Sequence, residues 1–251
     1  MGDAIVLAGG KCPHPLSRYA PYEACLTIGD RPMVHHVVRA LLDAPSIDRV
    51  VVLGPVDILR QLCLPEEVTV AEGADTIEGT LTRALRLATA DRPFLLASAD
   101  IPLLRASAVE YFWQSAEREG ADLAYPIVRR EQIEDSYQYA RRTYVRLADG
   151  IFTGGNLLYV NGSASESLLS FAQRIFAVRK KPWRIATLFG IRFCIDFLLR
   201  RLSTSDIEQH LSELWGRRCR ALIVPHAEIA MDVDKLSDYH LINKYMNETT
   251  R

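Results

Sequence analysis

Residues 5–11 of this 251-residue chain, with the sequence IVLAGGK, combine a short apolar run with two glycines and a lysine. A nearly continuous apolar run of this length predicts a strand buried on both faces. The small residues after it let backbone N–H groups approach a phosphate or a base closely, and Lys11 adds positive charge. The stretch lacks the later glycines of GxGxxG and the Lys-Ser/Thr pair of a P-loop, so an ordinary strand-to-loop turn is the alternative.

Similar apolar runs recur along the chain and predict further buried strands at 50–53, 94–97 and 221–224. Between them, residues 32–42 and 80–88 have the spacing of amphipathic helices. Strands that alternate with helices are typical of an α/β fold with a Rossmann-like, mostly parallel sheet.

The second half of the chain departs from this alternation. Residues 143–147 and 156–160 are predicted to be strands, and a largely helical stretch follows. We interpret this stretch as a helical insertion at about 163–216 within a single domain that spans 1–251, because no linker, low-complexity tract or internal repeat marks a boundary.

Composition limits the classes of partner and location. The chain has 30 Lys and Arg against 31 Asp and Glu, so no overall basic field favours nucleic acid. Five widely spaced cysteines indicate reduced thiols and a cytoplasmic location. The apolar stretch at 185–199 contains charged residues and is too short to cross a bilayer of about 30 Å. No pattern in the sequence sets the oligomeric state.

Asp100 follows the apolar run FLLASA at 94–99 and is predicted to stand at the carboxyl edge of the sheet. Open α/β sheets bind their ligands at this edge. A carboxylate there suits Mg²⁺, which takes one or two protein carboxylates and fills its remaining positions with water and phosphate oxygens. A helix N-cap is the alternative role for this aspartate.

The segment MDVDK at 231–235 supplies the next candidates. Alternation along an extended chain points Asp232 and Asp234 the same way, so one or both could meet Asp100 at a metal ion. In the alternative interpretation, Asp234 caps the final helix.

Together these segments resemble the MobA-like nucleoside triphosphate transferases, relatives of the molybdenum-cofactor guanylyl- and cytidylyltransferases. Leu7 to Gly10 match the LAGG loop that holds the nucleotide in that family, and Asp100 and Asp234 match two acidic positions that bind Mg²⁺. Residues 28–33 and 152–156 are also similar to family segments. The resemblance implies a fold of the nucleotide-diphospho-sugar transferase, GT-A-like type. It also implies molybdopterin guanylylation as the first activity to expect, while the extra helical stretch leaves a different phosphorylated metabolite open as the acceptor.

The resemblance also implies a reaction and a set of roles. The reaction is Mg²⁺-dependent transfer of a nucleoside monophosphate from an NTP to a phosphorylated small-molecule acceptor, with release of pyrophosphate. Lys11, Asp100 and Asp234 would be catalytic. The NTP would contact Leu7, Ala8, Gly9, Gly10, Lys11, Thr76 and Gly79. For Thr76, the role of helix N-cap is an equally good prediction. Gly155 and Asn156 would line the acceptor site.

Glu23 departs from the family pattern, which has a lysine at the start of the sequence KALL where this chain has EACL at 23–26. A carboxylate at this position repels a triphosphate. The departure motivates the alternative of a catalytically silent nucleotide-binding or regulatory protein. A glycosyltransferase that uses a nucleotide sugar is a further alternative, but such enzymes more typically show Asp-x-Asp where this chain has Ser98-Ala99-Asp100.

The stretch at 174–201 is rich in both cations and apolar residues, with eight Lys and Arg against the single acid Asp196. The cations are predicted to bind the phosphorylated acceptor, with Lys181 as the first candidate, and a weak contact with an anionic membrane surface is the other hypothesis. The apolar residues recur at helical spacing and are expected to pack onto the domain. They are Ile191, Ile195, Leu198 and Leu202.

Overall fold

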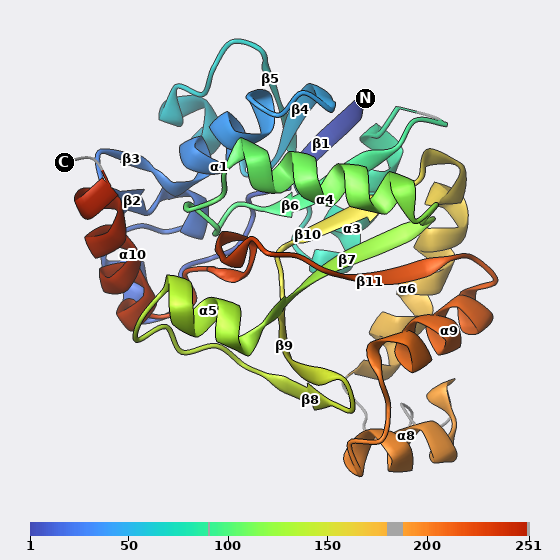
Figure 1. Cartoon of the computed structure of the whole chain (residues 1–251). Helices are drawn as coiled ribbons and strands as arrows, with labels where there is room; N and C mark the ends of the chain where they lie inside the picture. The colour runs from blue at the N-terminus through green and yellow to red at the C-terminus, as the bar shows by residue number, and fades with distance from the viewer. Residues whose placement is uncertain (90, 180–187, 250–251) are drawn as a thin grey trace.

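The computed structural model describes residues 1–89, 91–179 and 188–249 (Figure 1). Its strands are β1 (Gly2–Leu7), β2 (Thr27–Ile28), β3 (Arg31–Pro32), β4 (Ile47–Gly54), β5 (Val68–Glu72), β6 (Phe94–Ser98), β7 (Leu123–Arg129), β8 (Val145–Leu147), β9 (Gly150–Gly154), β10 (Leu157–Val160) and β11 (Cys219–Ile223). Its α-helices are α1 (Met33–Leu42), α2 (Val56–Leu59), α3 (Ile77–Leu87), α4 (Ala106–Arg118), α5 (Arg130–Ser136), α6 (Ser165–Arg179), α8 (Ile191–Leu198), α9 (Thr204–Trp215) and α10 (Leu236–Thr249). Among the short 3₁₀ turns, η2 (Glu23–Cys25) and η5 (Ala227–Ala230) lie near the site described below.

One mixed sheet forms the centre of the described structure. Its strand order is β5-β4-β1-β6-β10-β7-β9-β8, and β11 pairs with β7. Strands β5, β4, β1 and β6 are parallel to one another, while β10 runs antiparallel to both β6 and β7. Most strands thus share one direction and, with helices on both faces, form the α/β fold that the sequence predicts.

Alternate side chains of the central strands enter two separate cores, as strand geometry requires. In β1, Ala4 and Val6 pack in the core with α1 and α4, whereas Ile5 packs with α3 and α6 in the other core. Figure 1 shows α4 in front of the sheet and α3 and α6 behind it. The two layers bury β1 and β6 between them.

The predicted strands differ from the structure mainly between residues 123 and 160. The run at 156–160 contains β10, and the unpredicted strand β9 precedes it and forms a hairpin with β8. β7 escaped prediction because Pro126 stands inside it, and proline is uncommon in central strands.

Helices α6, α8 and α9 occupy the stretch predicted as a helical insertion. The prediction that its apolar residues pack onto the domain is wrong for Ile191, Ile195 and Leu198, which are exposed, whereas Leu202 is buried. Helical spacing shows which residues share a face but not whether a neighbour covers that face. Among the described residues, no helix is long and apolar enough to cross a membrane.

Candidate active site

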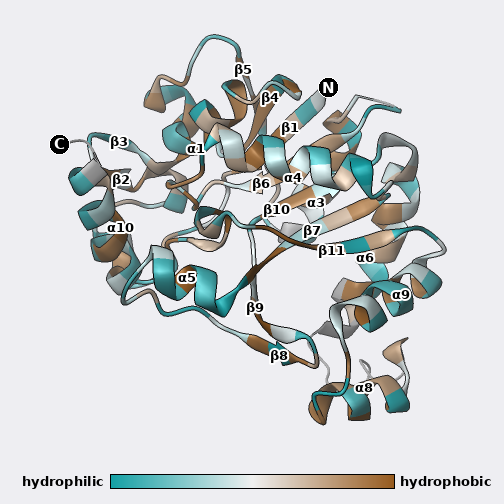
Figure 2. Ribbon diagram, in the orientation of Figure 1, coloured by the Kyte–Doolittle hydropathy of each residue, from teal (hydrophilic) through white to brown (hydrophobic). Residues whose placement is uncertain are grey.

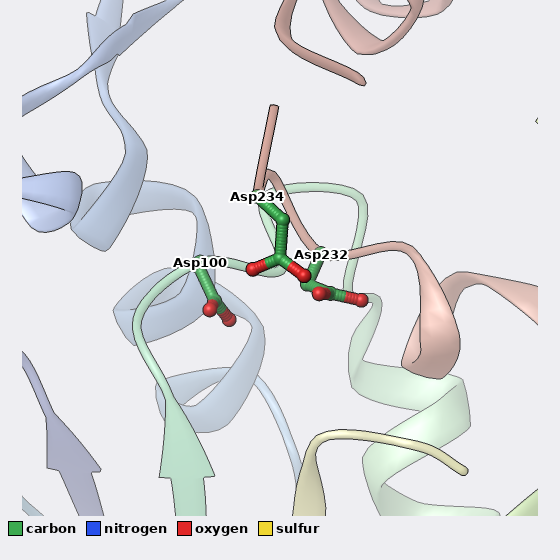
Figure 3. Close-up of side chains that lie close together, drawn as sticks. All are labelled: Asp100, Asp232 and Asp234. Atoms are coloured by element: carbon green, nitrogen blue, oxygen red, sulfur yellow. The ribbon is translucent and has the colours of Figure 1, made fainter. Parts of the chain in front are cut away.

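Three aspartates meet at the carboxyl end of β6 (Figure 3). Asp100 follows this strand, and Asp232 and Asp234 come from the loop between η5 and α10. One ligand oxygen from each lies within 4.8 Å of the others. The Val233 N–H donates a hydrogen bond of 3.0 Å to the Asp100 carbonyl oxygen and so joins the two segments.

The helix-capping alternatives do not describe these aspartates. Helix α4 begins at Ala106 with Arg105 at its N-cap, so Asp100 caps no helix. At the start of α10, the Asp238 carboxylate accepts a hydrogen bond of 3.0 Å from the Lys235 N–H. The acidic cluster therefore needs another explanation.

The three carboxylates differ in their partners. Asp232 is buried, forms an ion pair with Arg142, and accepts a 3.3 Å hydrogen bond from the Asn156 side-chain amide at its Oδ1. The buried Oδ1 of Asp100 has no hydrogen-bond partner within the part of the chain that the structure describes. Asp234 is exposed. Asp100 and Asp234 are thus the pair best placed to bind a cation, with Asp232 held at their side.

Burial, with the charge of Asp234 in addition, raises the pKa of Asp100, although Ser98 and Arg142 act in the opposite direction. A buried carboxylate oxygen without a donor is costly unless a positive charge compensates it. The donor set consists of carboxylate oxygens, which are the ligands that Mg²⁺ prefers. The residues present therefore fit a Mg²⁺ ion.

The loop after β1 lines a small recess close to this cluster. The recess has a volume of about 140 Å³, and its walls include Leu7, Gly9, Gly10 and Thr76. Ala8 is buried and donates its N–H to the Leu53 carbonyl oxygen, so it contributes to the shape of the loop rather than to the wall. The loop after β1 and the start of α3 thus border the same recess.

Three predicted nucleotide contacts lie in different surroundings. Thr76 is the N-cap of α3, because its hydroxyl accepts a 3.0 Å hydrogen bond from the Gly79 N–H. Gly79 is not among the residues that line the recess, and its N–H is already used by this cap. Lys11 is exposed beside the glycines, and its backbone pairs with Tyr22.

Of the predicted acceptor residues, Asn156 contacts the acidic cluster. Asn156 donates to Asp232, and its backbone N–H donates to the Ile229 carbonyl oxygen at 3.0 Å. Gly155 packs so closely that an added Cβ would lie 2.5 Å from Ile229 and 2.9 Å from Pro126. The remaining acceptor candidate, Lys181, lies outside the described residues.

Sequence reasoning missed the surroundings of Glu23. The Glu23 N–H donates a 2.9 Å hydrogen bond to the Gly10 carbonyl oxygen, and a Cβ on Gly10 would clash with the Glu23 carboxylate. Burial, with the charges of Asp100 and Asp234, raises the pKa of Glu23 to about 7. Glu23 is thus a half-buried acid between the glycine loop and the aspartates.

Arg142 is a second residue that sequence reasoning missed. Besides its ion pair, it donates a 3.1 Å hydrogen bond to the Asp232 carbonyl oxygen. It lies between α5 and β8, where no strand or helix pattern places it. The only available signal was its charge.

The sequence profile of the MobA-like NTP transferase domain matches residues 4–226. The chain therefore belongs to the MobA-like NTP transferase family and is a nucleotidyltransferase. No curated protein sequence gives a significant match.

Solved structures agree with this assignment. A hypothetical transferase from Thermus thermophilus is 32% identical, with a TM-score of 0.84 over 95% of this chain and 100% of that chain. CMP:2-keto-3-deoxy-manno-octonic acid synthetase in complex with CTP is 13% identical, with a TM-score of 0.65 over 98% of both chains. The 2-C-methyl-D-erythritol 4-phosphate cytidylyltransferase of Thermus thermophilus is 15% identical, with a TM-score of 0.56 over 98% of this chain and 100% of that chain. The last two similarities concern the fold.

Proposed function

We propose that this nucleotidyltransferase uses Mg²⁺ to transfer a nucleoside monophosphate from an NTP to a phosphorylated small molecule, with release of pyrophosphate. The observation that carries the proposal is the convergence of Asp100 and Asp234 at the end of β6. This convergence supports a cation site because the buried Asp100 Oδ1 lacks a hydrogen-bond partner among the described residues. A divalent cation bound to phosphates would supply the missing positive charge.

The glycine loop would hold the triphosphate. Gly9 and Gly10 are exposed and line the recess, so their backbone can approach phosphate oxygens closely. Lys11 would neutralise charge that develops on the leaving group. Bound Mg²⁺ would supply charge neutralisation for the reacting phosphates through Asp100 and Asp234.

The reaction needs no protein nucleophile. An oxygen of the acceptor phosphate attacks the α-phosphorus of the NTP and forms the new P–O bond. The bond between the α-phosphorus and the bridging oxygen breaks, and pyrophosphate leaves with that electron pair. The contribution of the chain is to position the two substrates and to stabilise charge.

The acceptor would bind next to Asn156. Its side-chain amide is oriented by Asp232, which Arg142 holds in turn. These contacts hold the Asn156 amide beside the aspartates, and the acceptor phosphate would bind there. Lys181 is a further candidate to bind that phosphate.

Glu23 stands where the resemblance has a lysine, and its carboxylate lies against Gly10. A charged Glu23 opposes binding of the triphosphate. Glu23→Gln removes this charge without loss of side-chain volume, so we expect the variant to bind the NTP more tightly than the natural chain.

The first test needs no acceptor. Melting temperatures are measured with ATP, CTP, GTP and UTP, each with and without Mg²⁺, because a ligand that binds only the folded state stabilises it. We expect a Mg²⁺-dependent rise with at least one nucleotide. Gly9→Ala is expected to reduce that rise but to leave the nucleotide-free melting temperature unchanged, since a Cβ at Gly9 would meet no atom within 4 Å. No shift with any nucleotide would contradict the proposal.

The second test measures pyrophosphate release with the stabilising nucleotide and a panel of phosphomonoesters. Asp100→Asn is expected to lower the rate by about a thousandfold, which corresponds to about 4 kcal/mol of transition-state stabilisation. Asp57→Asn, at an exposed position on α2, is the matched control and should keep the full rate. Full turnover by Asp100→Asn would show that the metal assignment is wrong.

A further inference from the structure

Helix α8 and the residue after it expose four aliphatic side chains on one face. Ile191, Ile195, Leu198 and Leu199 are 69%, 49%, 77% and 53% exposed. Their spacing of four, seven and eight residues from the first member places them on a single stripe of a helix. We call these four residues the aliphatic stripe.

The opposite face of α8 is fixed to the protein. The Phe193 ring stacks on His210 of α9, with 4.2 Å between the ring centroids, and Phe197, although 40% exposed, lines a cavity of about 410 Å³ between α8, α9 and the sheet. Beyond the helix, Leu202 is buried and its carbonyl oxygen accepts a 2.9 Å hydrogen bond from the Ala148 N–H. These contacts orient α8, so the aliphatic stripe faces outward because of how the helix packs.

The position of α8 in the molecule leaves the stripe without cover from the described residues. Figure 1 places α8 at an edge of the molecule, beyond α9 and away from the active site. Figure 2 shows strongly hydrophobic segments on this peripheral helix. Exposed apolar side chains that gather on one face of a helix are typical of an interaction site in a folded protein.

Cations flank the stripe. Arg192 has a side chain that is 97% exposed, and Arg200 and Arg201 are exposed directly after the last aliphatic residue. The single acid within the described segment 188–202 is Asp196, whose carboxylate lies 3.8 Å from Arg192. The described segment 188–202 therefore carries a net positive charge.

The aliphatic stripe and the arginines beside it together indicate which kind of partner would bind. A second copy of the chain would bring the same three arginines against one another, and such like-charge contact is unfavourable. An anionic bilayer offers both complements, since its phosphates attract the arginines and its acyl boundary accepts the aliphatic side chains. We propose that α8 docks the protein on an anionic lipid surface, with the aliphatic stripe at the boundary between headgroups and acyl chains and with Arg192, Arg200 and Arg201 on the lipid phosphates.

The contact is peripheral and reversible, because one short helix buries little apolar area and enters only the interface. It is also sensitive to salt, because the arginines are exposed and their attraction to the lipid is screened. The docking is independent of the proposed reaction, since none of these residues lies in the acidic cluster or the nucleotide recess.

The experiment is cosedimentation of the full chain with phosphatidylcholine vesicles that contain about 30% phosphatidylglycerol, compared with pure phosphatidylcholine vesicles. We expect binding to the anionic vesicles at about 50 mM salt, little binding at about 500 mM, and little binding to the neutral vesicles. Ile195→Gln combined with Leu198→Gln is expected to weaken binding about fivefold or more, as is Arg200→Gln combined with Arg201→Gln. Tyr139→Gln, at a residue 85% exposed on the loop after α5, is the matched control and should bind like the natural chain.

The variants change exposed side chains, and an unchanged melting temperature shows that they fold. Failure of the natural chain to sediment with anionic vesicles at low salt overturns the proposal, as does equal binding to neutral vesicles. A concentration-dependent dimer in sedimentation velocity that Ile195→Gln with Leu198→Gln dissociates, together with no vesicle binding, identifies a second copy as the occupant instead.

Discussion

The acidic cluster and helix α8 break the usual distribution of side chains in opposite ways. At the end of β6, the structure buries one carboxylate oxygen of Asp100, Oδ1, beside Asp232 and close to Asp234. At α8, it exposes aliphatic side chains such as Ile191 and Leu198. Buried charges and exposed apolar stripes are both unfavourable for an isolated chain.

The difference between the two regions lies in what would compensate each of them. In the acidic cluster, Arg142 pairs with Asp232 but no described residue donates a hydrogen bond to Asp100 Oδ1, and a divalent cation with its phosphate ligands would supply the missing positive charge. At helix α8, no described residue covers the aliphatic stripe, and under our proposal an anionic lipid surface would cover it. The comparison predicts that substitutions in the cluster change both folding stability and activity, whereas substitutions on the stripe change neither in solution.

The largest expected effect on stability is at Arg142. The Arg142 and Asp232 side chains are each only 11% exposed, so Arg142→Met leaves a buried carboxylate without its partner. We expect the free energy of unfolding to fall by about 3 kcal/mol in EDTA, measured by urea denaturation. Arg142→Met combined with Asp232→Asn should lose less, because no unpaired charge remains. If the double variant loses the sum of the two single losses, the pair does not stabilise the cluster in the way that we describe.

Glu23 should show a smaller effect of the opposite sign. Its pKa is raised to about 7, so its ionisation costs folding energy as the pH rises from about 4.5 through about 7, and the full cost is present above that range. Glu23→Gln should therefore stabilise the protein by about 1–2 kcal/mol at pH of about 8 in EDTA, after allowance for solvent screening, and by little at pH of about 5. Urea denaturation at both pH values measures this difference. An equal gain at both would show that charge is not its cause.

The smallest expected effect is on the aliphatic stripe. Because Leu198 is 77% exposed, Leu198→Gln should change the free energy of unfolding by less than about 0.5 kcal/mol and leave pyrophosphate release unchanged. The same denaturation and release assays measure both quantities. A loss of more than about 2 kcal/mol would mean that the stripe is covered within the protein, and the comparison would then fail.

The sequence predicts the acidic cluster because the apolar runs show where the strands end. The apolar runs of β1 and β6 fix where these parallel strands stop, and their carboxyl ends meet at one edge of the sheet. The sequence alone therefore places Asp100 and the glycine loop together. Asp234 joins them through its spacing from Asp232 and through the family resemblance.

Other parts of the site depend on contacts that no local pattern encodes. Arg142 lies in a segment without periodicity, and only the folded chain brings it to Asp232, 90 residues later. The proximity of Glu23 to the aspartates has the same origin. At α8, the pattern showed which residues share a face, but exposure is a property of the neighbours and not of the helix.

Binding of Mn²⁺, a paramagnetic substitute for Mg²⁺, tests the central claim most directly. Titrations followed by electron paramagnetic resonance, with the stabilising nucleotide present, would compare the natural chain with Asp100→Asn, Asp234→Asn and the exposed control Asp57→Asn. The account predicts that each of the first two variants binds Mn²⁺ at least about tenfold more weakly, a change of about 1.4 kcal/mol or more, and that the control binds like the natural chain. Unchanged Mn²⁺ binding by both Asp100→Asn and Asp234→Asn would contradict the assignment of this cluster as the metal site.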